Sequence, residues 1–203
     1  MEKLNTGDII LCHCKHDGQY DPGIDGIIEL FTHSPYEHAA MIIRDPPWIQ
    51  ESGLYILQSG RGPNSYPDVI NGNTSGVTLN LFSDFIRNRE YVCVRSITGI
   101  KWNKLEWFLL KKTFEKCHGR PYDLNYYSWI CTGIGSYCYC PWWSNFFVRK
   151  QDNRFWCSAL VAFIYTRMGW VREDLDWSDK TPSDLTRIKP IEPIGFSDIW
   201  RYN

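Results

Sequence analysis

Short apolar runs, separated by turn-forming residues, dominate the pattern of the first hundred residues. Each run is only a few residues long, and Gly, Pro, Asn and Asp lie between them. Runs with this length and these boundaries favour buried strands. We predict strands at residues 9–11, 38–43, 54–57, 77–79 and 91–94, and a last one at 194–200. The polar stretches 13–37 and 60–76 are predicted as loops, with one or two helical turns inside the first at 24–31.

The hydrophobic period changes to a helical one after residue 100. Apolar side chains from Trp102 to Phe114 fall near helical spacing, with Lys and Glu between them, and Gly119 follows. This pattern predicts an amphipathic helix that packs one face on a core. Residues 157–168 are apolar on nearly every side, so a buried helix is predicted there, ended by Gly169.

Two shorter helices are predicted from their N-terminal signals. Ser83 is expected to cap a short helix through residues 85–86. Thr181 is expected to cap another, with Pro182 at its first position, where the missing backbone N–H leaves no hydrogen bond unmade. Strands in the first half and a central helix near the end indicate one α+β domain over residues 1–203. Its antiparallel sheet is expected to pack on that central helix.

Residues 124–148 carry no charge and are rich in aromatic side chains. Within the irregular stretch 121–154 they are predicted to form an insertion. Two interpretations are open: the insertion covers the core, or it forms a hydrophobic lid or interfacial patch that suits an acyl chain or a lipid surface. Gly133, Gly135, Pro141 and several polar residues argue against a transmembrane helix here.

The charge balance argues against nucleic acid as a partner. The 203 residues hold 22 Lys and Arg against 23 Asp and Glu, with no basic field. The N-terminal residues lack the basic and apolar regions of a signal peptide. We therefore expect a cytoplasmic protein whose eight cysteines are reduced thiols.

Cys157 stands out among the cysteines because it begins the predicted buried helix. A helix N-terminus supplies partial positive charge and free N–H groups, which favour the thiolate, and the thiolate is the reactive form of cysteine. The preceding residues 150–156 are charged and aromatic, so this junction can open to solvent. A small hydrophobic residue of the core is the alternative interpretation.

A cysteine nucleophile needs a base, and the imidazole of histidine titrates in the right range. His38 is favoured because it begins a predicted strand, which would hold it rigidly at an edge that a substrate can reach. His13, His16 and His33 lie in predicted loops, and His118 lies at a helix end, where a cation is favourable anyway. A purely structural role for His38 is the alternative.

A metal site is only weakly indicated, by the sequence Cys-His-Cys-Lys-His at residues 12–16. Strand alternation would place Cys12, Cys14 and His16 on one face, and residues 138–140 could supply two more thiols. Structural zinc sites usually pair ligands separated by two or more residues, which these spacings do not match. We therefore expect free thiols, no metal and no cofactor.

A set of motifs follows the chain in a definite order. It comprises GDIIL at 7–11, SPYEHAAMI at 34–42 around His38, LYILQS at 54–59, GRPYD at 119–123, FWCSALV at 155–161 around Cys157, and TPSDL at 181–185. In this order the motifs resemble those of the circularly permuted NlpC-type papain-like hydrolases, the YiiX/YebB-like group. That group is related more remotely to lecithin retinol acyltransferase and is found in bacteria, poxviruses and other large DNA viruses.

The resemblance implies a permuted papain-like fold, in which His38 precedes Cys157 in the chain. It also implies a third residue that orients the imidazole. By position this residue is Gln58, where the group more often has Glu, and Glu51 is an alternative carboxylate nearby. A neutral amide accepts from the ring N–H but does not stabilise an imidazolium by charge.

The expected activity is that of a cysteine hydrolase or acyltransferase, which cleaves an amide, ester or thioester through an acyl-enzyme on Cys157. The Cys157 backbone N–H would serve the oxyanion, and further substrate-binding or oxyanion candidates are Tyr122, Ser158 and Trp156. The substrate would be an acylated small molecule, a peptide or a lipid, with peripheral membrane contact as one option. For a viral protein the host cytoplasm or the virion is the expected location. The neutral Gln58 motivates the alternative, an inactive member acting as a binding or virulence module.

Overall fold

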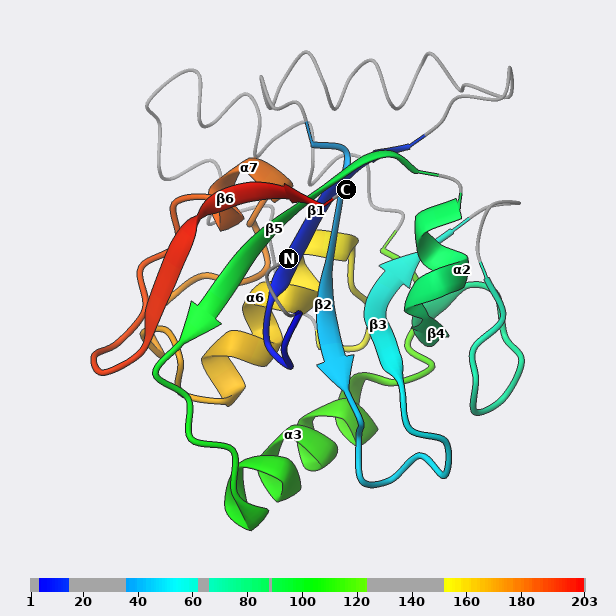
Figure 1. The fold of residues 1–203 in the computed structure, drawn as a ribbon, viewed down its shortest axis with the longest axis horizontal. Helices are drawn as coiled ribbons and strands as arrows, with labels where there is room; N and C mark the ends of the chain where they lie inside the picture. Colours follow the sequence, from blue (N-terminus) through cyan, green and yellow to red (C-terminus); the bar gives the residue numbers. More distant parts are fainter. Residues whose placement is uncertain (1–3, 15–35, 62–65, 88, 124–151, 203) are drawn as a thin grey trace.

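The computed structural model of the protein describes residues 4–14, 36–61, 66–87, 89–123 and 152–202. A six-stranded antiparallel sheet with the strand order β4-β3-β2-β1-β5-β6 lies at its centre (Figure 1). The strands are β1 Ile9–Cys14, β2 His38–Arg44, β3 Leu54–Gly60, β4 Gly76–Leu81, β5 Arg89–Thr98 and β6 Gly195–Tyr202. All the predicted strands form, and the predicted α+β class is confirmed.

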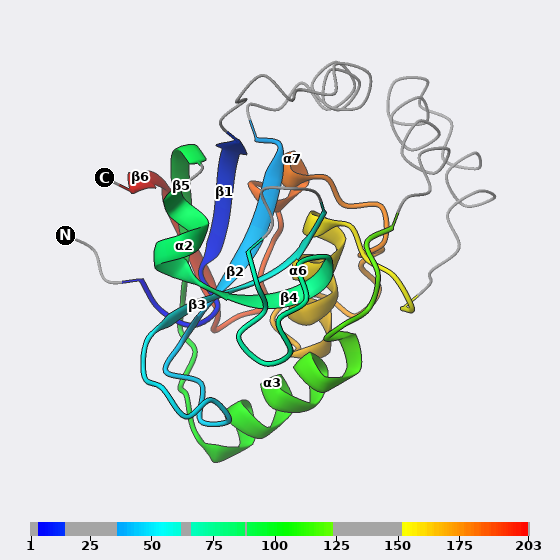
Figure 2. The same cartoon turned by 90° about the vertical axis from the view of Figure 1, so that its right-hand side faces the viewer.

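Alternation along the strands gives the sheet two apolar faces. One face packs on α6 (Cys157–Arg167) and α3 (Lys104–Cys117) through residues such as Ala39, Met41 and Leu57. The other face, with Ala40 and Ile42, is covered by α2 (Phe82–Arg87). Figure 2 shows α2 and α6 on opposite sides of the strands. The pleat therefore decides which of two environments each strand residue enters.

Helix α6 is the central helix that the sequence predicts. Residues 157–165 are all buried, and the helix ends at Arg167, just before Gly169 with φ of 69°. A left-handed residue at this position is a common helix end, because glycine has no Cβ to strain there. The buried helix of the prediction is confirmed, with its end one residue earlier.

Helix α3 begins two residues later than its apolar pattern suggests. The Asn103 side chain accepts hydrogen bonds from the backbone N–H groups of Leu105 (2.8 Å) and Glu106 (3.1 Å), which caps the helix. The helix ends before Gly119 (φ 75°), as predicted. Its buried face carries Leu110 and Phe114, so the amphipathic interpretation is confirmed.

The two short helices differ in how well their caps were predicted. Thr181 caps α7 (Pro182–Leu185) in a reciprocal pair with Asp184, and Pro182 is the first residue, as predicted. Ser83 does not cap α2, because this helix starts directly after β4, at the buried Phe82, which leaves Ser83 inside the first turn. Burial of Phe82 against the sheet thus sets the start of α2.

The Gly-Asp pair before β1 has a structural role. The buried Asp8 carboxylate accepts hydrogen bonds from the backbone N–H groups of Asn5 (2.8 Å) and Ile97 (3.0 Å), which joins the chain start to β5. Gly7 has φ of 95°, and a Cβ there would lie 2.9 Å from Ile97. The Gly7 carbonyl also accepts from the Tyr165 hydroxyl of α6. Glycine and aspartate are both needed for this turn.

Two predicted features, the helical turns at 24–31 and the aromatic insertion at 124–148, lie outside the described residues. Among the helices within the described ranges, none combines the length and the apolar character needed to cross a membrane. Cys93, Cys117 and Cys157 are free thiols.

Candidate functional site

Cys157 is the first residue of α6, and its side chain is only 2% exposed. Burial raises the pKa of the Cys157 thiol above its ordinary value, although hydrogen bonds from the backbone N–H groups of Ala39 and Ser158 act to lower it. Burial is the larger of these effects. The thiol is therefore protonated near neutral pH, and its reactivity depends on a base.

The segment before Cys157 is held between two parts of the chain. The Ser59 hydroxyl of β3 donates to the Phe155 carbonyl at 2.6 Å. On its other side, residues 121–123 pair with Phe155, through hydrogen bonds from Phe155 N–H to the Pro121 carbonyl (3.2 Å) and from Asp123 N–H to the Phe155 carbonyl (3.1 Å). The GRPYD motif thus fixes the approach of the chain to α6.

His38 is the first residue of β2 and lies opposite Cys12 of β1. Its ring Nε2 lies 2.8 Å from Gln58 Oε1. Burial lowers the pKa of His38 from 6.5 to about 3, the nearby Arg89 lowers it further, and the Gln58 hydrogen bond acts in the opposite direction. The imidazole is therefore neutral throughout the physiological range and has one nitrogen free to accept a proton.

Cys157 and His38 approach the start of β2 from its two sides. Ala39, whose N–H reaches the Cys157 sulfur, has its side chain on the α6 face. The His38 ring lies on the other face, 6.0 Å from the Phe85 ring of α2 between centroids. Among the described residues no hydrogen bond joins the thiol to the imidazole. The thiol contacts the backbone N–H of Ala39, and the imidazole is the side chain of the preceding residue, His38. Both groups therefore lie at the start of β2.

Gln58 belongs to a chain of polar side chains that continues beyond His38. Its Nε2 donates to Asn80 Oδ1 at 2.7 Å, and the Thr78 hydroxyl donates to the same oxygen at 2.9 Å. The Asn80 Nδ2 donates in turn to the backbone carbonyls of Tyr66 (2.7 Å) and Pro67 (3.0 Å). Sequence reasoning missed Asn80. The signal was there, because two polar residues alternate at 78 and 80 within an otherwise apolar strand.

Glu51, the alternative partner for His38, lies elsewhere. It is exposed, and its backbone carbonyl accepts from the Tyr55 hydroxyl at 2.7 Å. The His38 ring instead contacts the oxygen of the neutral Gln58 amide, which accepts the hydrogen bond.

The further candidates Trp156 and Ser158 direct their polar groups to one backbone oxygen. The Trp156 indole N–H and the Ser158 hydroxyl both donate to the Lys180 carbonyl, at 3.0 and 2.5 Å. Both residues are buried, so these groups hold the segment before α7 against the start of α6. The backbone of Tyr122 pairs with Phe155, two residues before Cys157.

His13 and Cys12, near the start of the chain, take structural positions. His13 lies between Glu37 (3.0 Å) and Glu90 (3.4 Å), and Cys12 is buried on the α2 face. His16 and residues 138–140 lie outside the described residues. Within the described ranges, no group of three or more His, Cys, Asp and Glu side chains is arranged to hold a metal ion.

Acid is expected to destabilise the fold through His38. The unfolded ring has the ordinary pKa of 6.5 and the folded ring a pKa of about 3, so between these values the unfolded chain binds a proton that the folded chain does not. Stability therefore falls as the pH falls below about 6.5, by up to about 1.4 kcal/mol per pH unit. Urea unfolding of wild type and His38→Asn over this range measures the effect. Equal pH slopes for the two proteins would contradict it.

The site thus combines a buried thiol at a helix start, a neutral imidazole at a strand start, and an amide that contacts the imidazole. The three groups come from α6, β2 and β3, and they gather at one end of the sheet. Comparisons with protein-family models, with curated proteins and with solved structures find no match to this chain.

Proposed function

We propose that this protein is a cysteine-dependent hydrolase or acyltransferase, which cleaves an amide, ester or thioester through an acyl-enzyme on Cys157. One observation carries the proposal. The His38 ring contacts the Gln58 amide at 2.8 Å, and the next residue, Ala39, directs its N–H to the Cys157 sulfur. A thiol, a neutral imidazole and an amide acceptor at one strand end are the groups that nucleophilic thiol catalysis requires.

In the proposed reaction, the Cys157 thiol proton passes across the start of β2, through one bridging water molecule, to the unprotonated His38 nitrogen as the Cys157 sulfur attacks the substrate carbonyl. The oxyanion that forms accepts hydrogen bonds at the start of α6, from the Cys157 N–H. The leaving group departs with the proton held by His38, and the acyl group stays on sulfur. Water or an acceptor, activated by the same nitrogen, then releases the acyl group and restores the thiol.

The finer description of the fold belongs to this proposal. An antiparallel sheet packed on a helix that begins with cysteine, and a histidine strand that precedes it in the chain, support a permuted papain-like arrangement. The substrate would be an acylated small molecule, a peptide or a lipid, and the cytoplasm of a cell, or of a host for a viral protein, is the proposed location.

A thiol-directed acyl probe tests the proposal. Wild type should be labelled at Cys157, as located by peptide mass mapping, and Cys157→Ala should not be labelled there or turn over the probe. Cys93→Ala is the matched control, because Cys93 is a more accessible free thiol outside the site. Equal turnover by wild type and Cys157→Ala would refute the proposal.

A non-catalytic binding module is the second candidate. It is favoured by the burial that raises the pKa of Cys157, and by the neutral amide beside His38. In that case the Cys157→Ser variant, which changes a single atom, should keep the biological phenotype of the wild type. Loss of the phenotype in this variant would rule the module out.

A further inference from the structure

The hydrogen-bond chain behind His38 has only one possible direction. The Asn80 Nδ2 lies 2.7 and 3.0 Å from the carbonyl oxygens of Tyr66 and Pro67, and a backbone carbonyl only accepts. The nitrogen of the Asn80 amide must therefore face these two carbonyls. Its oxygen must face Gln58 and accept from it.

The same reasoning passes through Gln58 to the ring. Because Asn80 Oδ1 accepts at 2.7 Å, the nitrogen of the Gln58 amide faces Asn80, and the Gln58 oxygen faces His38. This oxygen also only accepts, so the His38 Nε2 at 2.8 Å must carry the hydrogen. In the neutral ring the Nδ1 atom is then bare.

We propose that Asn80 is a positioning residue that, through Gln58, fixes His38 in the tautomer with hydrogen on Nε2, which leaves Nδ1 to take the thiol proton. The role of Nδ1 rests on the proposed function, whereas the direction of the chain does not. Within the described residues, Asn80 makes no hydrogen bond to the thiol or to the imidazole, and it acts through Gln58 alone.

The carbonyls that set this direction are themselves held in place. The buried Asp68 carboxylate accepts from the backbone N–H groups of Ile70 (2.7 Å) and Leu79 (2.7 Å), and it lies 2.8 Å from the His118 ring at the end of α3. Asp68 thereby ties the segment that carries Tyr66 and Pro67 to β4. The Asn80 amide meets two fixed acceptors and cannot turn over without losing both.

This network also explains why residue 58 is an amide. A carboxylate at this position would accept from the His38 ring equally well, but it has no N–H for Asn80 Oδ1. Two oxygens would then face each other at the place of the 2.7 Å hydrogen bond. Gln58 and Asn80 form a matched pair, in which an amide at 58 is required by the amide at 80.

Long-range proton–nitrogen correlation spectra of the His38 ring test the inference, because they show which nitrogen carries hydrogen. Wild type should carry it on Nε2. Asn80→Leu, which keeps the size and removes the amide, should show a mixture of tautomers or hydrogen on Nδ1, because the Gln58 amide can then turn. If Asn80→Leu does not fold, Asn80→Ser carries the same expectation, since a hydroxyl can offer Gln58 either a hydrogen or a lone pair.

Thr78→Val is the matched control. It removes the other donor to Asn80 Oδ1 and leaves the bond from Gln58 in place, so the tautomer should stay as in wild type. Hydrogen on Nδ1 in wild type, or hydrogen kept wholly on Nε2 in the folded Asn80 variants, would overturn the inference.

Acylation rates separate this inference from the proposed function. Asn80→Leu should lower the maximal rate of Cys157 acylation by about 100-fold, with little change in the probe concentration at half saturation. If the His38 tautomers of wild type and Asn80→Leu are as expected but wild type is never acylated, the proposed function alone is refuted. Normal acylation in Asn80→Leu, with the wild-type tautomer, would refute the positioning role alone.

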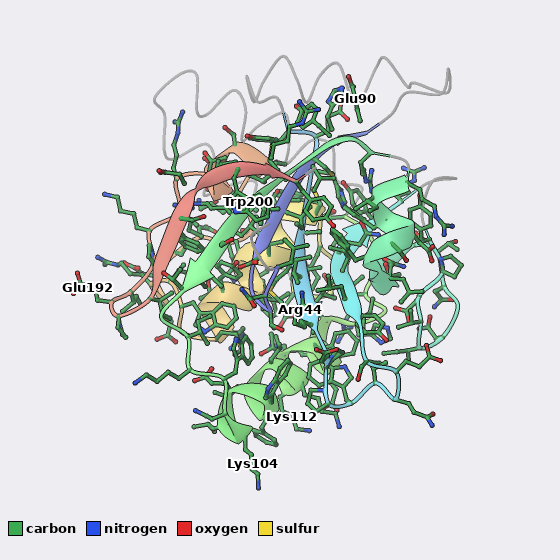
Figure 3. All side chains as sticks on the ribbon, in the orientation of Figure 1. Arg44, Glu90, Lys104, Lys112, Glu192 and Trp200 are labelled. Carbon is green, nitrogen blue, oxygen red and sulfur yellow. The ribbon has the colours of Figure 1, made fainter. Side chains whose placement is uncertain are left out.

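A second, independent observation concerns the outer face of α3. Leu105, Phe108 and Leu109 are 62, 55 and 37% exposed there. Exposed lysines surround them, at Lys101, Lys104, Lys111, Lys112 and Lys116. Figure 3 shows Lys104 and Lys112 on this helix, at the edge of the molecule. Two acidic residues form ion pairs with these lysines: Glu115 with Lys111 and Lys112, and Asp152 with Lys116. The five lysines outnumber these two acids, so the face keeps an excess of positive charge.

From this surface we infer that the α3 face docks on an anionic phospholipid bilayer. Exposed leucine and phenylalanine can enter the boundary between headgroups and acyl chains, while lysine stems lie along the apolar surface and place their charges among the phosphates. Protein interfaces are depleted in lysine, which argues against a protein partner. In Figure 1, α3 lies toward the end of β2 rather than its start, so this contact is separate from the site at His38.

Flotation with vesicles tests the surface. The full chain should bind vesicles that contain phosphatidylserine, bind neutral phosphatidylcholine vesicles far less, and lose affinity at least about tenfold in Leu105→Ser/Phe108→Ser. Ile70→Ser is the control, because Ile70 is also exposed (48%) but lies in the turn before β4 and not on α3. Unchanged binding in the α3 variant, or a concentration-dependent dimer of wild type that this variant abolishes, would overturn the inference.

Discussion

Replacing His38 with asparagine is expected to slow acylation of Cys157 by about 10²- to 10⁴-fold. The reason is the state of the thiol, since burial raises the pKa of Cys157 and leaves it protonated at neutral pH. Without the His38 base, only the small thiolate fraction can react. Stopped-flow or mass-spectrometric rates with the acyl probe measure the change.

The pH dependence of these rates adds a second criterion. In wild type the pKa of His38 is lowered to about 3, so the base stays available on the acid side of neutrality and the rate should vary little there. In His38→Asn the rate should instead rise about tenfold per pH unit, with the thiolate fraction.

His13→Asn is the matched control for the base. His13 also lies on a strand next to β2, but its ring pairs with Glu37 and Glu90 and stacks on Tyr91. Its replacement should leave the rate close to that of wild type. The same loss in both variants, or parallel pH profiles in wild type and His38→Asn, would show that His38 is not the base.

Replacing Phe163 with alanine should lower the free energy of unfolding by about 3–5 kcal/mol. Phe163 lies at the middle of α6, is fully buried, and packs against the rings of Phe155 (5.0 Å between centroids) and Trp177 (5.1 Å). The smaller side chain would leave a cavity between α6 and the segment that precedes Cys157. Urea unfolding at neutral pH measures the loss.

Phe108→Ala is the matched control for this cavity. It removes the same atoms from a side chain that is 55% exposed on α3, and surface changes of this kind usually alter stability by less than about 0.5 kcal/mol. Similar losses in the two variants would mean that α6 does not form the core described here.

The elements that could be predicted from the sequence are those whose signals are local. The apolar run at 38–43 and its Pro boundary are enough to predict β2, and the all-round apolar pattern at 157–168 is enough to predict α6. The start of α2 could not be predicted in this way, because Phe82 is drawn into the helix by packing on the sheet. The capping signal of Ser83 is weaker than that long-range contact.

The candidate site shows the same division. His38 and Cys157 could be singled out because each begins an element, and Gln58 through the resemblance. Asn80 is marked in the sequence only by the polar alternation at 78 and 80. Its role could not be predicted, since it comes from the carbonyls of Tyr66 and Pro67, which reach it only after β4 pairs with β3. Likewise, nothing local indicates that the polar groups of Trp156 and Ser158 would both turn to the Lys180 carbonyl.

The position of α6 late in the chain has a consequence for biosynthesis. Strands β1 to β5 leave the ribosome well before residues 157–167, and until then the face formed by Ala39, Met41 and Leu57 has only α3 to cover it. A nascent chain of this length exposes a broad apolar sheet surface, which invites chaperone binding or aggregation. Closure depends on pairings between distant segments, so the finished chain should fold over milliseconds to seconds, in the range typical of sheet-rich domains. The thiol of Cys157 joins the histidine strand only in that last step.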